Sequence, residues 1–137
     1  MRPEMTTDAT DQPIDYDPRW VASFKGERDR LRIATGIATL KFEHIGPTAI
    51  PGGRARPIVD LLIGAPAETW AALPDLRAKL VSLGYEDLGD GGTAGQVKFR
   101  RRALRSFDLT LVEYEGALWQ EQLRQRDAQR AARAATT

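Results

Sequence analysis

Residues 43–60 read EHIGPTAIPGGRARPIVD, a loop rich in glycine and proline between two hydrophobic segments. Glycine lets the backbone approach a ligand closely. Arginine side chains donate hydrogen bonds in a geometry that suits phosphate and carboxylate groups. We therefore predict that the loop at residues 46–56 binds an anionic group. The loop residues expected to contact that group are Gly46, Thr48, Gly52, Gly53, Arg54 and Arg56.

Two aspartates interrupt hydrophobic segments that we expect to be strands. Asp60 lies within residues 57–63, and Asp108 holds the corresponding place within residues 106–113. Because side chains alternate along a strand, each aspartate faces away from its apolar neighbours. If the two strands are neighbours, the carboxylates converge, and such a pair can hold a divalent cation or act as acid and base. The alternative is that each aspartate faces solvent or pairs with an arginine.

The single histidine, His44, is the candidate proton carrier, because an imidazole titrates near neutral pH. The alternative is a packed strand residue that bonds a carbonyl group. Lys98, Arg100 and Arg102 alternate along one predicted strand, and this basic stripe would attract anions if it lay beside the loop. Otherwise the stripe is a solvated face. The predicted catalytic residues are His44, Asp60 and Asp108, and Lys98 and Arg100 complete the predicted anion-binding set.

The hydrophobic pattern predicts an α+β fold. Asp17 followed by Pro18 is typical of a helix start, and Gly36 is typical of a helix end. The expected helices cover residues 17–35, 67–83 with a restart at Leu73-Pro74, and 115–134; the expected strands cover residues 40–45, 57–63, a short segment from 84, and a hairpin of 96–102 with 106–113. These proportions favour a mixed sheet covered by helices on one side.

The motifs DYDPRW at residues 15–20 and HIGPTAIPG at residues 44–52 resemble those of the GrpB family, a branch of the nucleotidyltransferase-like superfamily. The resemblance continues through ARPIVDLLIG and LVSLGYE, and it extends from Ile14 to Asp127. It implies a nucleotidyltransferase-like mixed β-sheet of about four to five strands covered by helices. In this family the domain occurs alone or joined to a coenzyme A biosynthetic kinase.

The chain departs from the motifs of active nucleotidyltransferases. Those enzymes carry Gly-Ser and then an acid-x-acid pair, whose carboxylates bind the metal ions that neutralise phosphate charge. Here the corresponding residues are Gly46-Pro47 and Asp60-Leu61-Leu62, so the serine hydroxyl and one acid are missing. A histidine-rich strand of the family is replaced by SFDLTLV at residues 106–112. We therefore expect no required cofactor and only weak Mg²⁺ binding at Asp60 and Asp108.

The favoured interpretation is a GrpB-like domain that binds an anionic small molecule, either a nucleotide or a phosphorylated metabolite. The pocket would be formed by residues 46–56, 57–63 and 106–113, without ordinary two-metal nucleotidyl transfer. The first alternative is a small metabolic enzyme that performs metal-independent acid–base chemistry on a carboxylated substrate. The second is a non-catalytic assembly module that uses the arginine-rich end of the last helix. Catalysis, substrate and oligomeric state stay open.

The chain of 137 residues is long enough for one domain with its own core. We expect a flexible leader at residues 1–13, the folded domain at 14–127 and an alanine- and arginine-rich tail at 128–137. No apolar run reaches the roughly 20 residues that span a membrane. With no cysteine as well, a cytoplasmic location is the expectation. The net charge of +1 makes nucleic acid an unlikely partner.

Overall fold

The computed structural model describes residues 11–136, and its centre is a five-stranded mixed sheet. The strands lie in the order β2-β4-β7-β6-β5. They comprise β2 (Lys41–Ile45), β4 (Ile58–Ala65), β5 (Glu86–Asp87), β6 (Gln96–Arg102) and β7 (Ser106–Glu113). β4 and β7 are parallel, and the other neighbouring pairs are antiparallel. The predicted α+β class with a mixed sheet is therefore confirmed.

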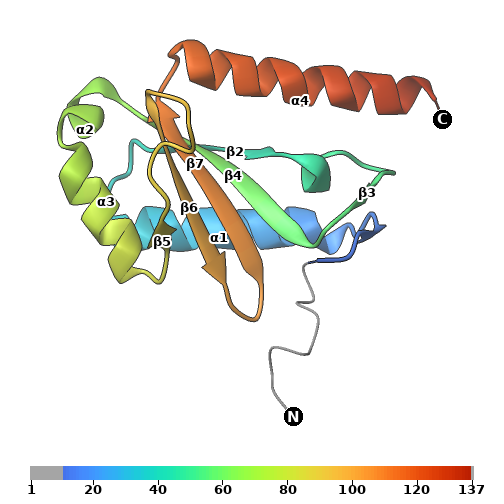
Figure 1. The fold of residues 1–137 in the computed structure, drawn as a ribbon, viewed down its shortest axis with the longest axis horizontal. Helices are drawn as coiled ribbons and strands as arrows, with labels where there is room; N and C mark the ends of the chain where they lie inside the picture. Colours follow the sequence, from blue (N-terminus) through green and yellow to red (C-terminus); the bar gives the residue numbers. More distant parts are fainter. Residues whose placement is uncertain (1–10, 137) are drawn as a thin grey trace.

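Helices cover both faces of this sheet, where the sequence pattern predicted one (Figure 1). The helices are α1 (Arg19–Thr35), α2 (Ala67–Ala71), α3 (Leu73–Ser82) and α4 (Ala117–Ala135), with a short 3₁₀ turn η2 (Pro47–Ala49) after β2. α1 and α3 pack on one face, and α4 runs along the other. We call these the α1 face and the α4 face. The break between α2 and α3 lies at the predicted restart, before Pro74.

The main core lies between the sheet and α1. Its strand residues alternate as predicted, and they include Val59, Leu61 and Ile63 of β4 together with Phe107, Leu109 and Leu111 of β7. A smaller cluster on the α4 face joins Ile45, Leu62, Val112 and Trp119. β4 is thus buried on both faces along most of its length, as expected for a strand in the middle of a sheet covered on both sides.

A buried carboxylate ties α1 to the β5–β6 edge of the sheet. Glu27 of α1 is only 5% exposed and forms a 2.9 Å ion pair with Arg30. The Tyr85 hydroxyl donates to Glu27 at 2.6 Å, and Arg101 of β6 lies 3.4 Å away. Because the carboxylate is fully partnered, its burial is tolerated. Hydrogen bonds from Arg30 and Tyr85 hold the pKa of Glu27 below its usual range, although burial acts in the opposite direction.

The ends of the chain differ from the predicted boundaries. Most of the predicted leader, residues 1–13, lies outside the described residues. Residues 14–15 form a strand, β1 (Ile14–Asp15), which pairs with β3 (Arg54–Ala55) and was not predicted. α4 continues without a break through the expected boundary at residues 127 and 128. Within that continuation, the Arg130 guanidinium donates to the Ala49 carbonyl at 3.0 Å, so this part of α4 contacts the domain.

Candidate functional site

Asp60 of β4 and Asp108 of β7 are register partners in the parallel strand pair. Their side chains therefore share one face of the sheet, the α4 face. This is the placement expected if the two strands are neighbours, and the alternative of an arginine partner also holds for Asp108. Asp108 accepts a 2.8 Å hydrogen bond from Arg102 Nη1. Asp60 is half-buried, and it accepts no hydrogen bond from any residue between 11 and 136.

The Asp60 carboxyl has a strongly altered proton affinity. Burial raises the pKa of Asp60 to about 7, and the neighbouring Asp108 carboxylate raises it as well. Lys98, Arg102 and Arg56 act in the opposite direction, but their effect is smaller. Asp60 therefore keeps its proton to a higher pH than an ordinary aspartate, and carboxyl groups with a perturbed pKa are concentrated at functional sites.

The loop after β2 brings its backbone against Asp60. Gly46 has a φ of 75°, a conformation that side chains rarely allow. In addition, a Cβ atom at this position would lie 2.2 Å from Asp60 Oδ2. Glycine is therefore required at position 46 for both reasons, and the predicted contact of Gly46 with an anionic ligand stays a prediction.

Two basic side chains of β6 lie beside the carboxylates. Lys98 Nζ donates a 2.7 Å hydrogen bond to Thr110 Oγ1 on β7, and Arg102 binds Asp108. We define the carboxylate site as these five residues: Gly46, Asp60, Lys98, Arg102 and Asp108. Arg100, which was also predicted to bind the anion, instead lies 3.4 Å from Glu86 of β5, towards the edge of the sheet.

The predicted loop residues do not form one surface. Arg56 is exposed and acts electrostatically on Asp60. Arg54 instead donates to the Pro13 carbonyl at 2.8 Å and lies 3.7 Å from Asp15. Its pairing in the β1–β3 ribbon therefore holds it away from the aspartates. Gly52 and Gly53 lie against Arg133 of α4.

His44 lies on the α1 face and is separated from the two aspartates by the sheet. It is the register partner of Leu61, whose side chain belongs to the main core. The His44 ring stacks on Phe24 with centroids 5.0 Å apart, and Nε2 lies 2.9 Å from Thr48 Oγ1. Burial lowers the pKa of His44 to about 4, and Arg130 and Arg126 contribute. The predicted grouping of His44 and Thr48 with the aspartates is therefore wrong: strand alternation directs His44 inward, and Thr48 of η2 is fully buried against it.

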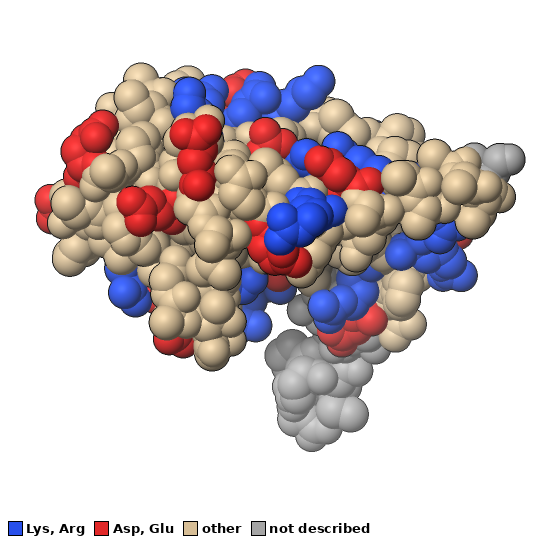
Figure 2. Space-filling model, turned by 90° about the horizontal axis from the view of Figure 1, so that it is seen from above, with Lys and Arg blue, Asp and Glu red and all other residues tan. Residues whose placement is uncertain are grey.

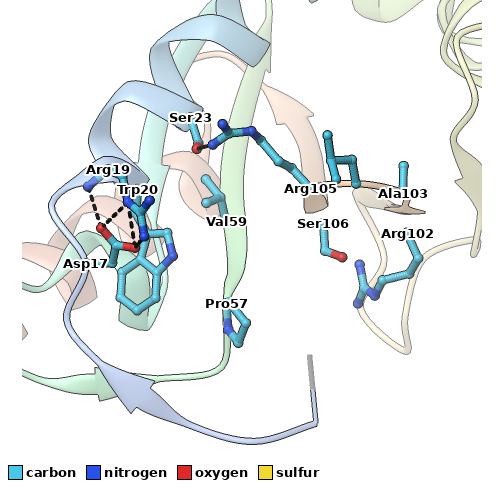
Figure 3. Close-up of a pocket in the computed structure, with 11 residues that line it drawn as sticks. Asp17, Arg19, Trp20, Ser23, Pro57, Val59, Arg102, Ala103, Arg105 and Ser106 are labelled. Atoms are coloured by element: carbon cyan, nitrogen blue, oxygen red, sulfur yellow. Dashed lines mark hydrogen bonds and ion pairs between the residues drawn. The ribbon is translucent and has the colours of Figure 1, made fainter. Parts of the chain in front are cut away.

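A cavity of about 530 Å³ adjoins the carboxylate site at the start of β4 and β7. Figure 3 shows Arg105 reaching across to Ser23, where its Nη1 donates to Oγ at 2.7 Å, and the Asp17–Arg19 pair beside Trp20. Arg102 lines this cavity and also binds Asp108, so it belongs to both. The cavity is lined by Asp17, Arg19, Trp20, Ser23, Pro57, Val59, Arg102, Ala103, Leu104, Arg105 and Ser106.

The cavity was missed in the sequence because its walls come from three separate segments. Asp17 was interpreted only as a helix start, although its carboxylate does accept a hydrogen bond from the Arg19 backbone at 2.9 Å. The one available signal was the basic run RRALR at residues 101–105. That run follows Lys98 on the same hairpin, but sequence alone does not place it next to α1.

The residues present do not fit the two-metal site of ordinary nucleotidyltransferases. Leu62 stands where the second acid is expected, and it is fully buried in the apolar cluster with Trp119. One oxygen of Asp108 is bound by the Arg102 guanidinium. Within residues 11–136 no three His, Cys, Asp or Glu side chains are grouped in a way that could hold a metal ion.

The surface over α4 carries charges of both signs. Figure 2 shows Lys and Arg side chains interspersed with Asp and Glu across this side of the molecule. An extended basic surface, which nucleic-acid binding favours, is not seen on this side. Among the residues that the structure describes, none of the helices is long and apolar enough to span a membrane.

Comparison with known proteins identifies the family of this chain. The model of the family described as "GrpB protein" matches residues 14–137. The UPF0157 protein YqkA of Bacillus subtilis is 31% identical over 86 residues, which are 63% of this chain and 24% of that protein. The chain spans between 24% and 37% of the length of four such curated relatives.

Solved structures agree with this assignment. GrpB from Enterococcus faecalis superposes with a TM-score of 0.76 at 26% identity, covering 90% of this chain and 74% of that one. The Cid1 poly(U) polymerase, in a structure with Mg and 3′-dATP bound, gives a TM-score of 0.60 at 13% identity, covering 87% and 37%, which is a likeness of fold alone. The chain therefore belongs to the GrpB family, and its fold is nucleotidyltransferase-like.

Proposed function

We propose that this chain binds a phosphorylated small molecule, a nucleotide or a phosphorylated metabolite, at the carboxylate site. The observation that carries the proposal is the gathering of three cationic side chains, Lys98, Arg102 and Arg56, around two carboxyl groups, Asp60 and Asp108. Positive charge is then in excess, and a cleft with excess positive charge attracts anions.

The basic groups retain donors for such a ligand. A lysine ammonium has three donors and an arginine guanidinium has five. Lys98 uses one donor on Thr110, and Arg102 directs Nη1 to Asp108. The remaining donors suit the several oxygens of a phosphate group. The adjoining cavity of about 530 Å³ has a size typical of small-molecule sites. We propose that it receives the organic part of the ligand, with Arg102 at the junction.

A second candidate function is metal-independent acid–base chemistry on a carboxylated substrate. The pKa of Asp60, about 7, favours it, because a general acid or base is most effective near the working pH. Asp60 would exchange the proton, and Lys98 with Arg102 would hold the substrate carboxylate. His44, on the other face, takes no part in this scheme.

The assembly-module alternative has less support. Arg126 donates to Glu43 at 2.6 Å, and Arg130 donates to the Ala49 carbonyl, so both arginines are used within the domain. We retain a cytoplasmic location as part of the proposal, consistent with a sequence that contains no cysteine.

A thermal-shift screen separates the two candidates, because a ligand that binds the folded state raises the melting temperature. The probes are AMP, ATP, inorganic phosphate and citrate at pH 7. We expect AMP or ATP to raise the melting temperature, and Arg102→Gln to reduce that rise. Arg124→Gln, which removes an exposed arginine of α4, is the matched control. A rise with citrate alone favours the acid–base candidate, and no rise with any phosphorylated probe contradicts the proposed function.

A further inference from the structure

Lys98 places a positive charge in the carboxylate site close to Leu62, the residue that replaces the second acid of the motif. Leu62 and Thr110 are register partners on β4 and β7, and Thr110 in turn is the register partner of Lys98 on β6. Lys98 Nζ is held at 2.7 Å from Thr110 Oγ1. The ammonium group is therefore anchored over β7, the strand next to Leu62. Its partner Thr110 lies two residues after Asp108, on the same face of the sheet.

Lys98 differs from the neighbouring arginine of its strand in having no carboxylate partner. Arg100 lies 3.4 Å from Glu86, whereas Lys98 bonds only a neutral hydroxyl and forms no ion pair with the part of the chain that the structure describes. Lys98 is nevertheless half-buried. Its ammonium keeps two donors that no described residue uses, so it can bind a further acceptor such as a ligand oxygen.

A divalent cation would meet repulsion at this site. The Lys98 ammonium and the Arg102 guanidinium both act on the carboxylates that would bind the metal. Like charges a few ångströms apart disfavour each other strongly where solvent is partly excluded. Leu62 offers no oxygen to offset this, because it is packed with Ile45, Val112 and Trp119.

We infer that Lys98 and Arg102 supply the positive charge that metal ions supply in ordinary nucleotidyltransferases, so that the ligand is a metal-free phosphate ester such as a nucleoside monophosphate. This inference rests on the proposed function and narrows its ligand class. A complex of magnesium with a nucleoside triphosphate would bring a metal cation next to the Lys98 ammonium and the Arg102 guanidinium. A monophosphate brings only negative charge, which Lys98 and Arg102 can bind directly.

The test is isothermal titration calorimetry with AMP and with ATP at pH 7, each in EDTA and in excess MgCl₂. We expect the affinity for AMP to agree within about twofold between the two buffers, and ATP to bind at least as tightly in EDTA. Lys98→Met should weaken AMP binding by at least about tenfold, as expected for loss of a charge-assisted hydrogen bond. Lys98→Arg, which keeps the charge, should recover part of that loss.

Lys25→Met is the matched control, since Lys25 is an exposed lysine of α1 on the other side of the sheet. It should leave AMP affinity unchanged. ATP binding that requires Mg²⁺, or AMP binding that is unaffected by Lys98→Met, overturns the inference while the proposed function stands. If neither nucleotide binds the wild-type protein in either buffer, the proposed function fails and the inference fails with it.

Discussion

The ionisable groups on the two faces of the central sheet differ in how completely they are hydrogen-bonded within the domain. On the α1 face, Glu27 and His44 are buried and each has hydrogen-bond partners within the domain. On the α4 face, Asp60 is half-buried without a hydrogen bond from the described residues, and Lys98 has only a hydroxyl partner. Glu27 and His44 thus have hydrogen-bond partners on one side of the sheet, whereas Asp60 has none among the described residues and Lys98 has only a hydroxyl on the other.

This difference distinguishes ionisable groups that serve folding from those of the proposed ligand site. A buried polar group that is partnered contributes to a defined fold, while one that is not partnered reduces stability. Unfavourable groups of the second kind cluster at sites that bind or react. We therefore expect substitutions of Glu27 and His44 to change stability, and substitutions in the carboxylate site, the proposed ligand site, to change binding as well. The four predictions below test this division.

The largest effect is expected from Leu62→Asp, which restores the missing acid on the α4 face. Leu62 is fully buried in the cluster with Trp119, so a carboxylate there has no solvent and no donor. We expect a loss of more than about 3 kcal/mol in the free energy of unfolding. Urea denaturation measures it. Leu62→Met, the control, should lose less than about 1.5 kcal/mol. Wild-type stability in Leu62→Asp would show that the functional part of this face extends further than described.

The next effect is on the pH dependence of the free energy of unfolding, to which His44 on the α1 face and Asp60 on the α4 face contribute with opposite sign. The pKa of His44 is lowered from 6.5 to about 4, so below pH 6.5 the unfolded chain binds a proton that the folded protein does not. His44 therefore makes the protein less stable as pH falls. The pKa of Asp60 is raised from 3.8 to about 7, so above pH 3.8 the unfolded chain releases a proton that the folded protein keeps. Asp60 therefore makes it less stable as pH rises to 7.

Substituting one of the two residues should reveal the pH dependence of stability that the other one causes. In Asp60→Asn the free energy of unfolding should rise between about pH 4.5 and 6.5, and in His44→Asn it should fall between about pH 4.5 and 7.5, each by roughly 2–4 kcal/mol. Urea denaturation at a series of pH values measures both. Asp75→Asn, an exposed carboxyl of α3, should keep the wild-type profile. Parallel profiles for Asp60→Asn and His44→Asn would contradict the division between the faces.

Glu27→Gln should have a smaller effect and act on stability alone. The substitution weakens the contacts with Arg30 and Tyr85, but both arginines of the network keep some solvent exposure. We expect a loss of roughly 1–3 kcal/mol by urea denaturation, with ligand affinity unchanged. A change in AMP affinity greater than the loss of stability can explain would mean that the Glu27 network also serves ligand binding.

The smallest effect is expected from Arg126→Met at the end of the α4 face. Arg126 joins α4 to Glu43 at 2.6 Å and to the His44 carbonyl at 3.3 Å. Its loss should cost about 1 kcal/mol and accelerate amide hydrogen exchange after residue 126. Arg124→Met, whose partner Glu121 lies on the same helix, is the control. Equal exchange rates in both variants would indicate that Arg126 does not anchor the helix.

Much of the fold followed from local patterns. Apolar alternation at residues 57–63 and 106–113 predicted strands at nearly their observed bounds, and Gly36 ends α1 with a φ of 70° as its position indicated. The β1–β3 ribbon was not predicted, because two-residue strands leave too little pattern. The covering of the α4 face was missed because α4 has few apolar residues, and Trp119 carries most of the contact.

The sequence by itself determined which side of its own strand each site residue occupies, because side chains alternate along every strand. It also determined that the second acid and the serine of the motif are absent. Only the tertiary structure decided that Asp60 lies beside Asp108, that Lys98 and Arg102 join them, and that His44 and Arg54 do not. Those outcomes depend on strand order and register between distant segments, and these are set by the packing of the whole core.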